Sequence, residues 1–222
     1  MKITFYGHAA FLIEGTKRVL IDPFISQNPI CNTKVSEIPK VDYILVTHDH
    51  ADHLGDAFEI AKRDDALIIT IHEISLLAAE KGIKAEGMNI GGKIIPENGI
   101  EIFMTNSVHS SSNGGECGFI LTMDGKNIFH TGDTGLTYDL KVVKELFDTI
   151  DVAMFPVGDR YTMGIPSVKI AADWIRPKIL IPMHYNTWEI INVSKEKLEE
   201  LKNDLKNKTE VKILNPGESF EI

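Results

Sequence analysis

The stretch VTHDHADHLGD, residues 46–56, holds three histidines and three aspartates within eleven positions and begins at the last residue of the apolar run YILV. Such a run is typical of a short buried strand, and Leu54, Ala57 and Ala61 then recur at helical spacing. Residues 48–53 are therefore predicted to form the loop between a strand and a helix, where functional side chains commonly lie on a rigid scaffold.

Four residues of this loop belong to the types that bind metals: His48, His50, Asp52 and His53. Neutral imidazole is the commonest metal ligand in proteins, and mixed nitrogen and oxygen donors suit zinc, manganese or iron. The alternative, a polar loop whose histidines form only local hydrogen bonds, does not account for so dense a group. A catalytic zinc usually takes three protein ligands, since one position stays open for water, so four in one loop indicate a second ion.

Three further residues of ligand type lie downstream, each where an apolar strand meets a loop. His109 follows EIFMTNSV, Asp133 lies in HTGDTG just after NIF, and His184 follows ILIPM. Each residue alone is more typical of a local hydrogen bond than of a metal ligand. Because the same placement recurs three times, we expect all three side chains to reach one site.

The rest of the chain predicts an α/β fold class. Residues 1–21 are predicted to form short strands with a turn at Gly15, and residues 26–40 a loop. Further strands are predicted at ALIITI, IEIFMTN, GFILTM, KNIFHT, DVAMFPV and KILIPM, with a hairpin turn at Asp124-Gly125. Predicted strands are followed by segments with helical spacing, and this order occurs twice along the chain. It favours one domain, residues 1–222, built of two similar halves packed as layers.

The composition limits the partners. Apolar residues make up 43% of the 222 residues and charged residues 25%, as in ordinary globular proteins. The formal net charge of −9 argues against nucleic acid, because nucleic-acid-binding proteins usually carry a basic patch or stripe. The lysines near the C-terminus alternate with acidic residues, which is typical of a solvated helix face. We expect a small-molecule substrate and no nucleic-acid partner.

The cysteines and the hydropathy bear on location. Cys31 and Cys117 are the only cysteines and are far apart in the sequence, which indicates no disulfide framework and a reducing compartment. No apolar run approaches the roughly 18 residues of a membrane span. The chain begins MKITFYGHAAF, without a stretch of signal-peptide type. These features predict a cytoplasmic protein with no membrane partner.

The motifs together resemble the metallo-β-lactamase superfamily, whose signature is HxHxDH followed by His, Asp and His at later strand ends. The resemblance extends from GHAAFLIEG to LNPGESFEI, nearly the whole chain. GHAAF, IDPF, HTGDTG and IPMHYNT are similar to a branch of bacterial and archaeal metal-dependent hydrolases related to L-ascorbate-6-phosphate lactonase. The resemblance implies a four-layer αβ/βα sandwich with a metal cleft at one edge of the sheets, and a homo-oligomer.

The resemblance also implies a ligand for each position of a two-ion site. The first ion is expected at His48, His50 and His109, and the second at Asp52, His53 and His184, with Asp133 bridging the two. All seven residue types of the signature are present. The ions are expected to be divalent, Zn²⁺ or Mn²⁺, with iron or nickel also compatible with these donors.

Such a site predicts a metal-dependent hydrolase that uses a hydroxide bound to two ions to cleave an ester-type bond in a lactone or a phosphodiester. Asp52 is expected to orient the hydroxide, and His8, in GHAAF, to contact substrate or protonate the leaving group; a structural role for His8 is the alternative. Asp22 is expected either to accept the second N–H of a ligand histidine or to stabilise a turn before Pro23.

Other polar residues receive lesser roles. Asp159 and Tyr185 are candidates for substrate contact, His130 for a structural role within a strand, and His72 for a surface position at the start of a helix. Asp49 and Asp56 are expected to be solvated or to support the ligands, and Cys117 to lie in the core.

Two other classes of function share this fold. A redox di-iron enzyme typically has a glutamate at the position of His50 and a fused flavin domain, whereas 38 residues follow His184 in this chain. A metal-binding sensor or scaffold without catalysis is disfavoured by the complete ligand set. A tRNA nuclease of this superfamily requires a basic surface that the composition does not offer.

Overall fold

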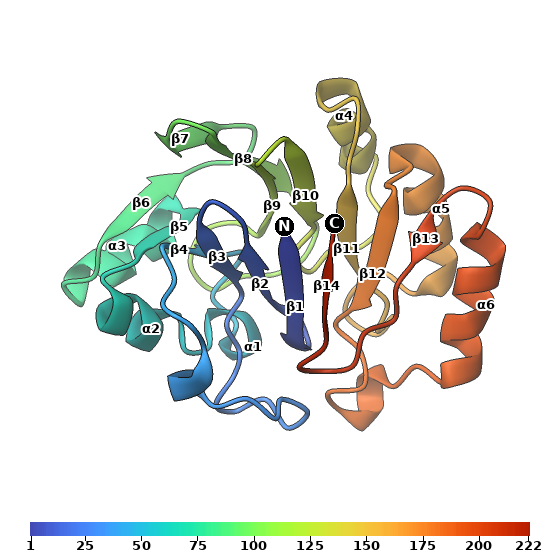
Figure 1. The fold of residues 1–222 in the computed structure, drawn as a ribbon, viewed down its shortest axis with the longest axis horizontal. Coiled ribbons are helices and arrows are strands. Elements are labelled where there is room, and N and C mark those ends of the chain that lie inside the picture. Colours follow the sequence, from blue (N-terminus) through green and yellow to red (C-terminus); the bar gives the residue numbers. More distant parts are fainter.

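Two seven-stranded sheets form the centre of the molecule in the computed structural model, which describes residues 1–222 (Figure 1). The first sheet contains β14 (Ser219–Glu221), β1 (Lys2–Gly7), β2 (Ala10–Glu14), β3 (Arg18–Ile21), β4 (Tyr43–Val46), β5 (Leu67–Ile71) and β6 (Ala85–Met88), in that order. The second contains β13 (Glu210–Val211), β12 (Ile179–Met183), β11 (Val152–Pro156), β10 (Lys126–His130), β9 (Cys117–Met123), β8 (Ile100–Asn106) and β7 (Lys93–Glu97).

Strand direction explains how residues distant in the sequence meet. β3 to β6 are parallel, and β1 runs in the same direction because it is separated from β3 by the antiparallel strand β2. In the second sheet β10 to β13 are parallel, and β8 shares their direction because β9 lies antiparallel between β8 and β10. The residues that follow β4, β8, β10 and β12 therefore leave their sheets at carboxyl ends, where α/β proteins commonly place ligands.

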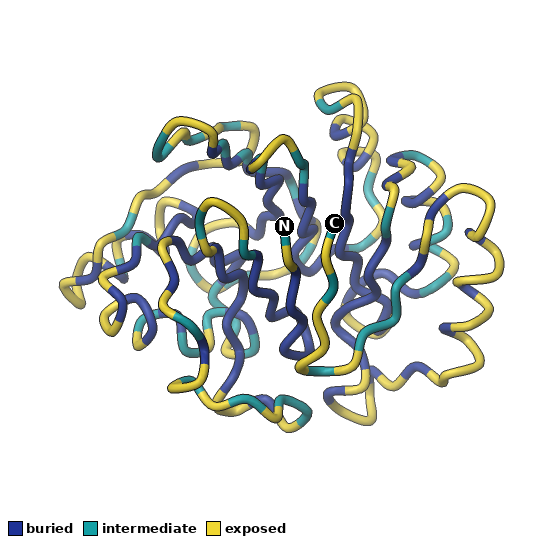
Figure 2. The backbone as a smooth tube through the Cα atoms, viewed as in Figure 1, coloured by how far each residue is buried: buried dark blue, intermediate teal, exposed yellow.

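Helices cover the outer face of each sheet. α2 (Ala57–Asp64) and α3 (His72–Glu80) contribute Ile60 and Ala78 to a cluster with Ile44 of the first sheet. The second sheet is covered by α4 (Asp139–Leu146), α5 (Ile165–Ile175) and α6 (Lys195–Leu205). A third cluster fills the space between the sheets and takes Phe11 from one and Phe119 from the other. The buried band in Figure 2 follows these strands, and the predicted four-layer αβ/βα sandwich is confirmed.

Several local predictions are confirmed. Strands lie at the predicted apolar runs, and Asp124 and Gly125 form the hairpin turn between β9 and β10, both with positive φ (51° and 72°). Helix α3 begins at His72, whose side chain is exposed, and Cys117 is fully buried at the start of β9.

One prediction about the metal-binding loop is wrong. Residues 48–53 do not form a loop throughout, because a short helix, α1 (Ala51–Leu54), begins within the motif. The amide of His53 donates to the carbonyl of His50 at 3.0 Å, and Gly55 ends the turn with a φ of 42°. The helical turn places Asp52 and His53 on successive positions of a rigid backbone instead of an open loop.

The remaining elements are short. A 3-10 turn, η1 (Val35–Glu37), interrupts the predicted loop at residues 26–40. A second 3-10 turn, η2 (Glu189–Ile191), lies in the segment between β12 and α6. β6, β7, β13 and β14 were not predicted, because they are short, lie at sheet edges and carry many exposed residues. None of the helices has the length and hydropathy needed to cross a membrane.

Candidate metal centre

The backbone turns sharply at three positions directly after strands. His8 follows β1, Asp22 follows β3 and His184 follows β12, with φ angles of 58°, 44° and 56°. Non-glycine residues rarely adopt this left-handed conformation, which costs of order 1–3 kcal/mol each and is often found at functional sites. The turns at His8 and His184 bring the centroids of their two rings to 4.0 Å, and the amide of His184 donates to the carbonyl of His8 at 2.7 Å.

A first group consists of His48, His50 and His109, whose ligand atoms all lie within 4.8 Å of one another. His48 Nε2 and His50 Nδ1 are 3.0 Å apart. Two nitrogen ligands of one tetrahedral zinc, each bonded at its usual distance, lie about 3.4 Å apart, so this spacing is close to that of a shared ion. His109 donates its Nδ1 proton to the carbonyl of Tyr161 at 3.1 Å, which leaves Nε2 free on the side of the group.

A second group consists of His8, Asp52, His53 and His184, also within 4.8 Å. Asp133 lies between the two groups. Its Oδ2 is 2.8 Å from Nε2 of His184, 3.4 Å from Nε2 of His53 and 3.8 Å from Nε2 of His109. The structure thus brings together all seven residues that the sequence placed at the site, with Asp133 in contact distance of both groups.

The donor atoms fit divalent ions because several of them are buried and have no other partner. Six buried side-chain polar atoms in the protein form no hydrogen bond, and four belong to this region: Nε2 of His53, Nδ1 of His184, Oδ1 of Asp133 and Oε2 of Glu116. Native proteins pair nearly all buried polar atoms. Their concentration beside converging imidazoles and carboxylates, the donors of zinc and manganese sites, is the pattern expected of a metal centre.

The electrostatics also favour cations. Burial lowers the pKa of His48, and burial together with the neighbouring His184 lowers the pKa of His8 to about 4, so both imidazoles are neutral at pH 7 and keep a lone pair. Burial opposes ionisation of Asp133, yet the adjacent His53 and His184 hold its pKa well below the usual range. Burial likewise opposes a charge on His53, but Asp133 and Asp22 raise its pKa, so positive charge is favoured at this point.

Asp22 orients one of the histidines. Its Oδ2 lies 2.8 Å from Nδ1 of His53 and accepts a hydrogen bond from the Thr47 hydroxyl, and its Oδ1 accepts from the Thr47 amide. The carboxylate is fully buried. Because Asp22 accepts the Nδ1 proton, Nε2 of His53 is the nitrogen that faces Asp133 and would bind an ion. This is the first of the two roles predicted for Asp22, support of a candidate ligand histidine.

Glu116 is a residue of the candidate site that sequence reasoning missed. Its side chain is buried, with Oε1 lying 3.1 Å from Nδ1 of His48 and accepting a hydrogen bond from the Asp133 amide at 3.1 Å. Burial and the charge of Asp133 raise the pKa of Glu116 to about 10. The residue lies in GGECG, before a strand, and no ligand-type spacing surrounds it. The only available signal was a lone acidic residue next to a core cysteine.

His8 is placed beside Asp52 and away from open solvent. Its Nε2 lies 3.1 Å from Oδ2 of Asp52, and its Nδ1 lies 2.7 Å from the Thr187 hydroxyl. The ring is fully buried and is not among the residues that line the pocket described below. The structure therefore does not place His8 where it could contact substrate directly, which was one of the two site roles predicted for it.

The lesser candidates are distributed around the site. Asp49 accepts hydrogen bonds from residues 111–113, and Asp56 accepts them from Ile25 and Ser26, so both aspartates hold loops near the motif. His130 uses both ring nitrogens within the protein, one with the Ala9 carbonyl and one with the Gly132 amide.

Two residues predicted as substrate contacts lie elsewhere. Asp159 is exposed and does not line the metal pocket. Tyr185 follows the sharp turn at His184 and faces a different cavity.

A pocket of about 310 Å³ opens onto the two groups. Its lining includes five of the expected ligands together with Ser110, Tyr161, Trp188 and Ile191. Tyr161 and Trp188 are largely exposed, and the Trp188 ring lies 5.2 Å from that of His8. Neither aromatic residue was predicted, because each stands alone in a loop. No lysine or arginine lines the pocket.

Known proteins with this sequence pattern share both fold and length. A family model described as the beta-lactamase superfamily domain matches residues 2–184. The chain is 43% identical to a UPF0173 metal-dependent hydrolase of Pyrococcus furiosus, with 100% of each chain covered, and 45% identical to one of Archaeoglobus fulgidus, with 100% and 99% covered. It is also similar to Igni18, a metallo hydrolase from Ignicoccus hospitalis, with a TM-score of 0.92, 36% identity, and 100% and 98% of the two chains covered.

The chain therefore belongs to the metallo-β-lactamase superfamily, as its ligand motif and four-layer fold had indicated. Within that superfamily it is a metal-dependent hydrolase of the UPF0173 family.

Proposed function

We propose that the two groups hold two divalent ions, Zn²⁺ or Mn²⁺, and that the protein hydrolyses an ester-type bond in a small uncharged substrate such as a lactone. The first ion is assigned to His48, His50 and His109, the second to Asp52, His53 and His184, with Asp133 between them. Iron or nickel can use the same donors. The observation that carries the proposal is the convergence of these seven side chains, five of which line one pocket.

Two close divalent ions, when bound, lower the pKa of a water molecule toward about 7 and polarise the bond that is attacked. The chain supplies the remaining requirements. Asp22 and Tyr161 fix the ring orientations of His53 and His109, so that the donor nitrogens are in place before substrate arrives. The carboxylate of Asp52 lines the pocket, where it can orient the attacking water.

His8 has a positioning role in this proposal. Its Nε2 contacts Asp52 and its Nδ1 contacts Thr187, so the imidazole ties the Asp52 carboxylate to the loop after β12. Because the ring is buried, it acts through Asp52 and not on the substrate.

The pocket favours a lactone over a phosphodiester. A phosphodiester keeps its negative charge throughout the reaction, and proteins that bind phosphate groups usually place lysine or arginine against the oxygens. This pocket has no such residue, whereas Trp188, Tyr161 and Ile191 provide apolar surface for a neutral substrate. The relationship to the ascorbate-6-phosphate lactonase branch stays a prediction, as do a cytoplasmic location and a homo-oligomer.

A substrate panel tests the proposal. The metal-loaded protein should hydrolyse uncharged aliphatic or aryl lactones faster than bis-aryl phosphodiesters, and a strong chelator should abolish both activities. Trp188→Ala should slow lactone hydrolysis, while His72→Ala, a change at an exposed histidine that does not line the pocket, should leave it unchanged. Full activity after complete metal removal would refute the metal mechanism, and a preference for phosphodiesters would refute the substrate assignment.

A further inference from the structure

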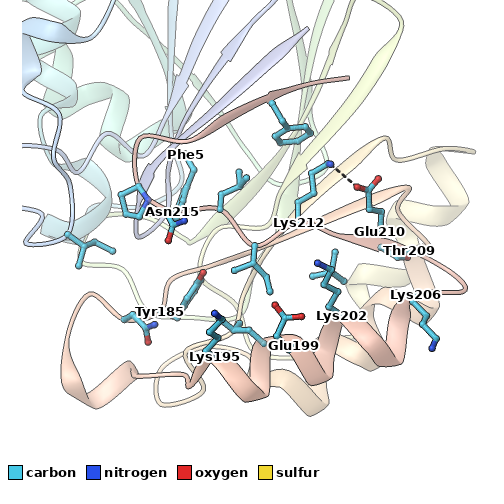
Figure 3. A pocket seen from close by; sticks show the side chains of 18 of the residues that line it. Phe5, Tyr185, Lys195, Glu199, Lys202, Lys206, Thr209, Glu210, Lys212 and Asn215 are labelled. Carbon is cyan, nitrogen blue, oxygen red and sulfur yellow. Dashed lines mark ion pairs between the residues drawn. The ribbon is translucent and has the colours of Figure 1, made fainter.

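A second and larger cavity, of about 1360 Å³, lies between α6 and the chain that leads from β13 to β14 (Figure 3). One wall is the face of α6 that carries Lys195, Glu199 and Lys202, and the other is formed by residues 207–216. None of the proposed metal ligands lines this cavity. Nothing in the proposed hydrolysis uses it.

The cavity has an excess of positive charge in an acidic protein. Five lysines and two glutamates line it, although the net charge of the chain is −9. Lys208 pairs with Asp173 and Lys212 with Glu210, but Lys195 and Lys202 have no ion-pair partner. Figure 3 shows these two side chains projecting from α6 toward the cavity, with Glu199 between them. Two unpaired cations give this wall a local excess of positive charge.

The floor of the cavity supplies a hydrogen-bond donor and apolar surface. Tyr185 is 8% exposed, and its hydroxyl makes no hydrogen bond within the protein but points into the cavity (Figure 3). The hydroxyl is therefore available to an occupant of the cavity. Burial raises the pKa of Tyr185 to about 12, which keeps the hydroxyl protonated as a donor. Phe5, Leu198 and Val211 form the apolar part of the floor.

We propose that this cavity binds an organic phosphate, with the phosphate held by Lys195, Lys202 and the Tyr185 hydroxyl and an apolar or aromatic body resting on Phe5 and Leu198. Lysine binds phosphate as a point charge, whereas planar carboxylates are usually recognised by the paired donors of arginine, and no arginine lines the cavity. The volume exceeds the roughly 300–1,000 Å³ of common ligand pockets, which leaves room for a body of nucleoside size.

Isothermal titration calorimetry with adenosine diphosphate tests this site on the intact protein. Inorganic pyrophosphate serves as the anion without a body, and adenosine as the body without an anion. Adenosine diphosphate should bind more tightly than either compound. Lys195→Gln combined with Lys202→Gln should weaken its binding by about tenfold or more, because each lysine supplies a charged hydrogen bond. Tyr185→Phe should weaken binding by about fivefold on the same ground.

Two changes on the same helix provide the controls. Lys197→Gln removes an exposed lysine that does not line the cavity and should leave the affinity unchanged. Glu199→Gln removes the nearest carboxylate on the cavity wall and should tighten binding, since a like charge opposes the phosphate.

Three results would overturn the proposal. The first is the absence of adenosine diphosphate binding at millimolar concentration. The second is equal affinity in the double lysine variant and in Lys197→Gln, which would place the ligand at the metal centre or elsewhere. The third is equal affinity for pyrophosphate and adenosine diphosphate, which would remove the apolar part of the site. None of these results bears on lactone hydrolysis, so the two proposals fail separately.

Discussion

Replacing Asp22 by asparagine tests how the metal ligands are held in place. In the native protein one Asp22 oxygen faces both Nδ1 of His53 and the Thr47 hydroxyl, at 2.8 and 2.7 Å. In Asp22→Asn an NH₂ group can take that position. It would donate to Nδ1 of His53, so the ring would carry its proton on Nε2 and lose the lone pair that faces Asp133.

The expected effect of Asp22→Asn is a lower metal affinity. Loss of a supporting hydrogen bond to a ligand histidine commonly lowers metal affinity about 10- to 100-fold, equivalent to about 1.4–2.8 kcal/mol. Competition between the metal-free protein and a chromophoric zinc chelator at fixed pH measures this difference. Urea unfolding of the same metal-free samples shows whether the fold is retained.

Asp56→Asn is the matched control. Asp56 also accepts several hydrogen bonds, from the backbone of Ile25 and Ser26 and from the Ser26 hydroxyl, but it contacts no proposed ligand. Its replacement should lower the free energy of unfolding without changing metal affinity. If Asp22→Asn binds zinc as tightly as the native protein does, the orienting role assigned to Asp22 is wrong.

Three further predictions concern substrate, packing and pH. Trp188→Ala should raise KM for an aryl lactone about three- to tenfold with metal content unchanged, because an aromatic contact contributes about 0.5–1.5 kcal/mol; an unchanged KM would remove Trp188 from the binding surface. Gly132→Ala should cost at least about 2 kcal/mol in urea unfolding, since φ is 63° and the new Cβ would lie 2.3 Å from the Cys117 carbonyl oxygen; Gly125→Ala, with a φ of 72° but open space around it, should cost less. Burial raises the pKa of Asp64, but hydrogen bonds from Arg63 and the Val41 amide lower it below its usual range. The ionised Asp64 carboxylate therefore stabilises the fold at pH values above the ordinary aspartate pKa of about 3.9. This stabilisation is lost as pH falls through the lower pKa that Asp64 has in the folded protein. The stability difference between the native protein and Asp64→Asn should shrink below about pH 4, and a constant difference would contradict the assignment.

The convergence of the candidate ligands could be predicted from the sequence because its physical basis is regular. Each of His48, His109 and His184 follows an apolar run, and strands that share a direction bring such positions to one edge of the sheets. The helix within the motif could not be predicted, because four residues are too few to show helical periodicity.

Residues that depend on tertiary contacts were beyond the sequence. Glu116 supports His48 from a glycine-rich loop, and its burial depends on β9 packing beside the motif strand. Tyr185 follows a ligand and was expected near substrate, but the left-handed turn at His184 directs it into the second cavity. Strand β14 has three residues and is defined only by its pairing with β1.

Metal content per chain tests the central claim most directly. Elemental analysis of the purified protein after saturation and removal of excess ions should give two divalent ions per chain. His50→Ala removes one ligand of the first group and should reduce this value to one, whereas His72→Ala should leave it at two. A native protein that retains a single ion, or a His50→Ala variant that retains two, would contradict the two-ion centre.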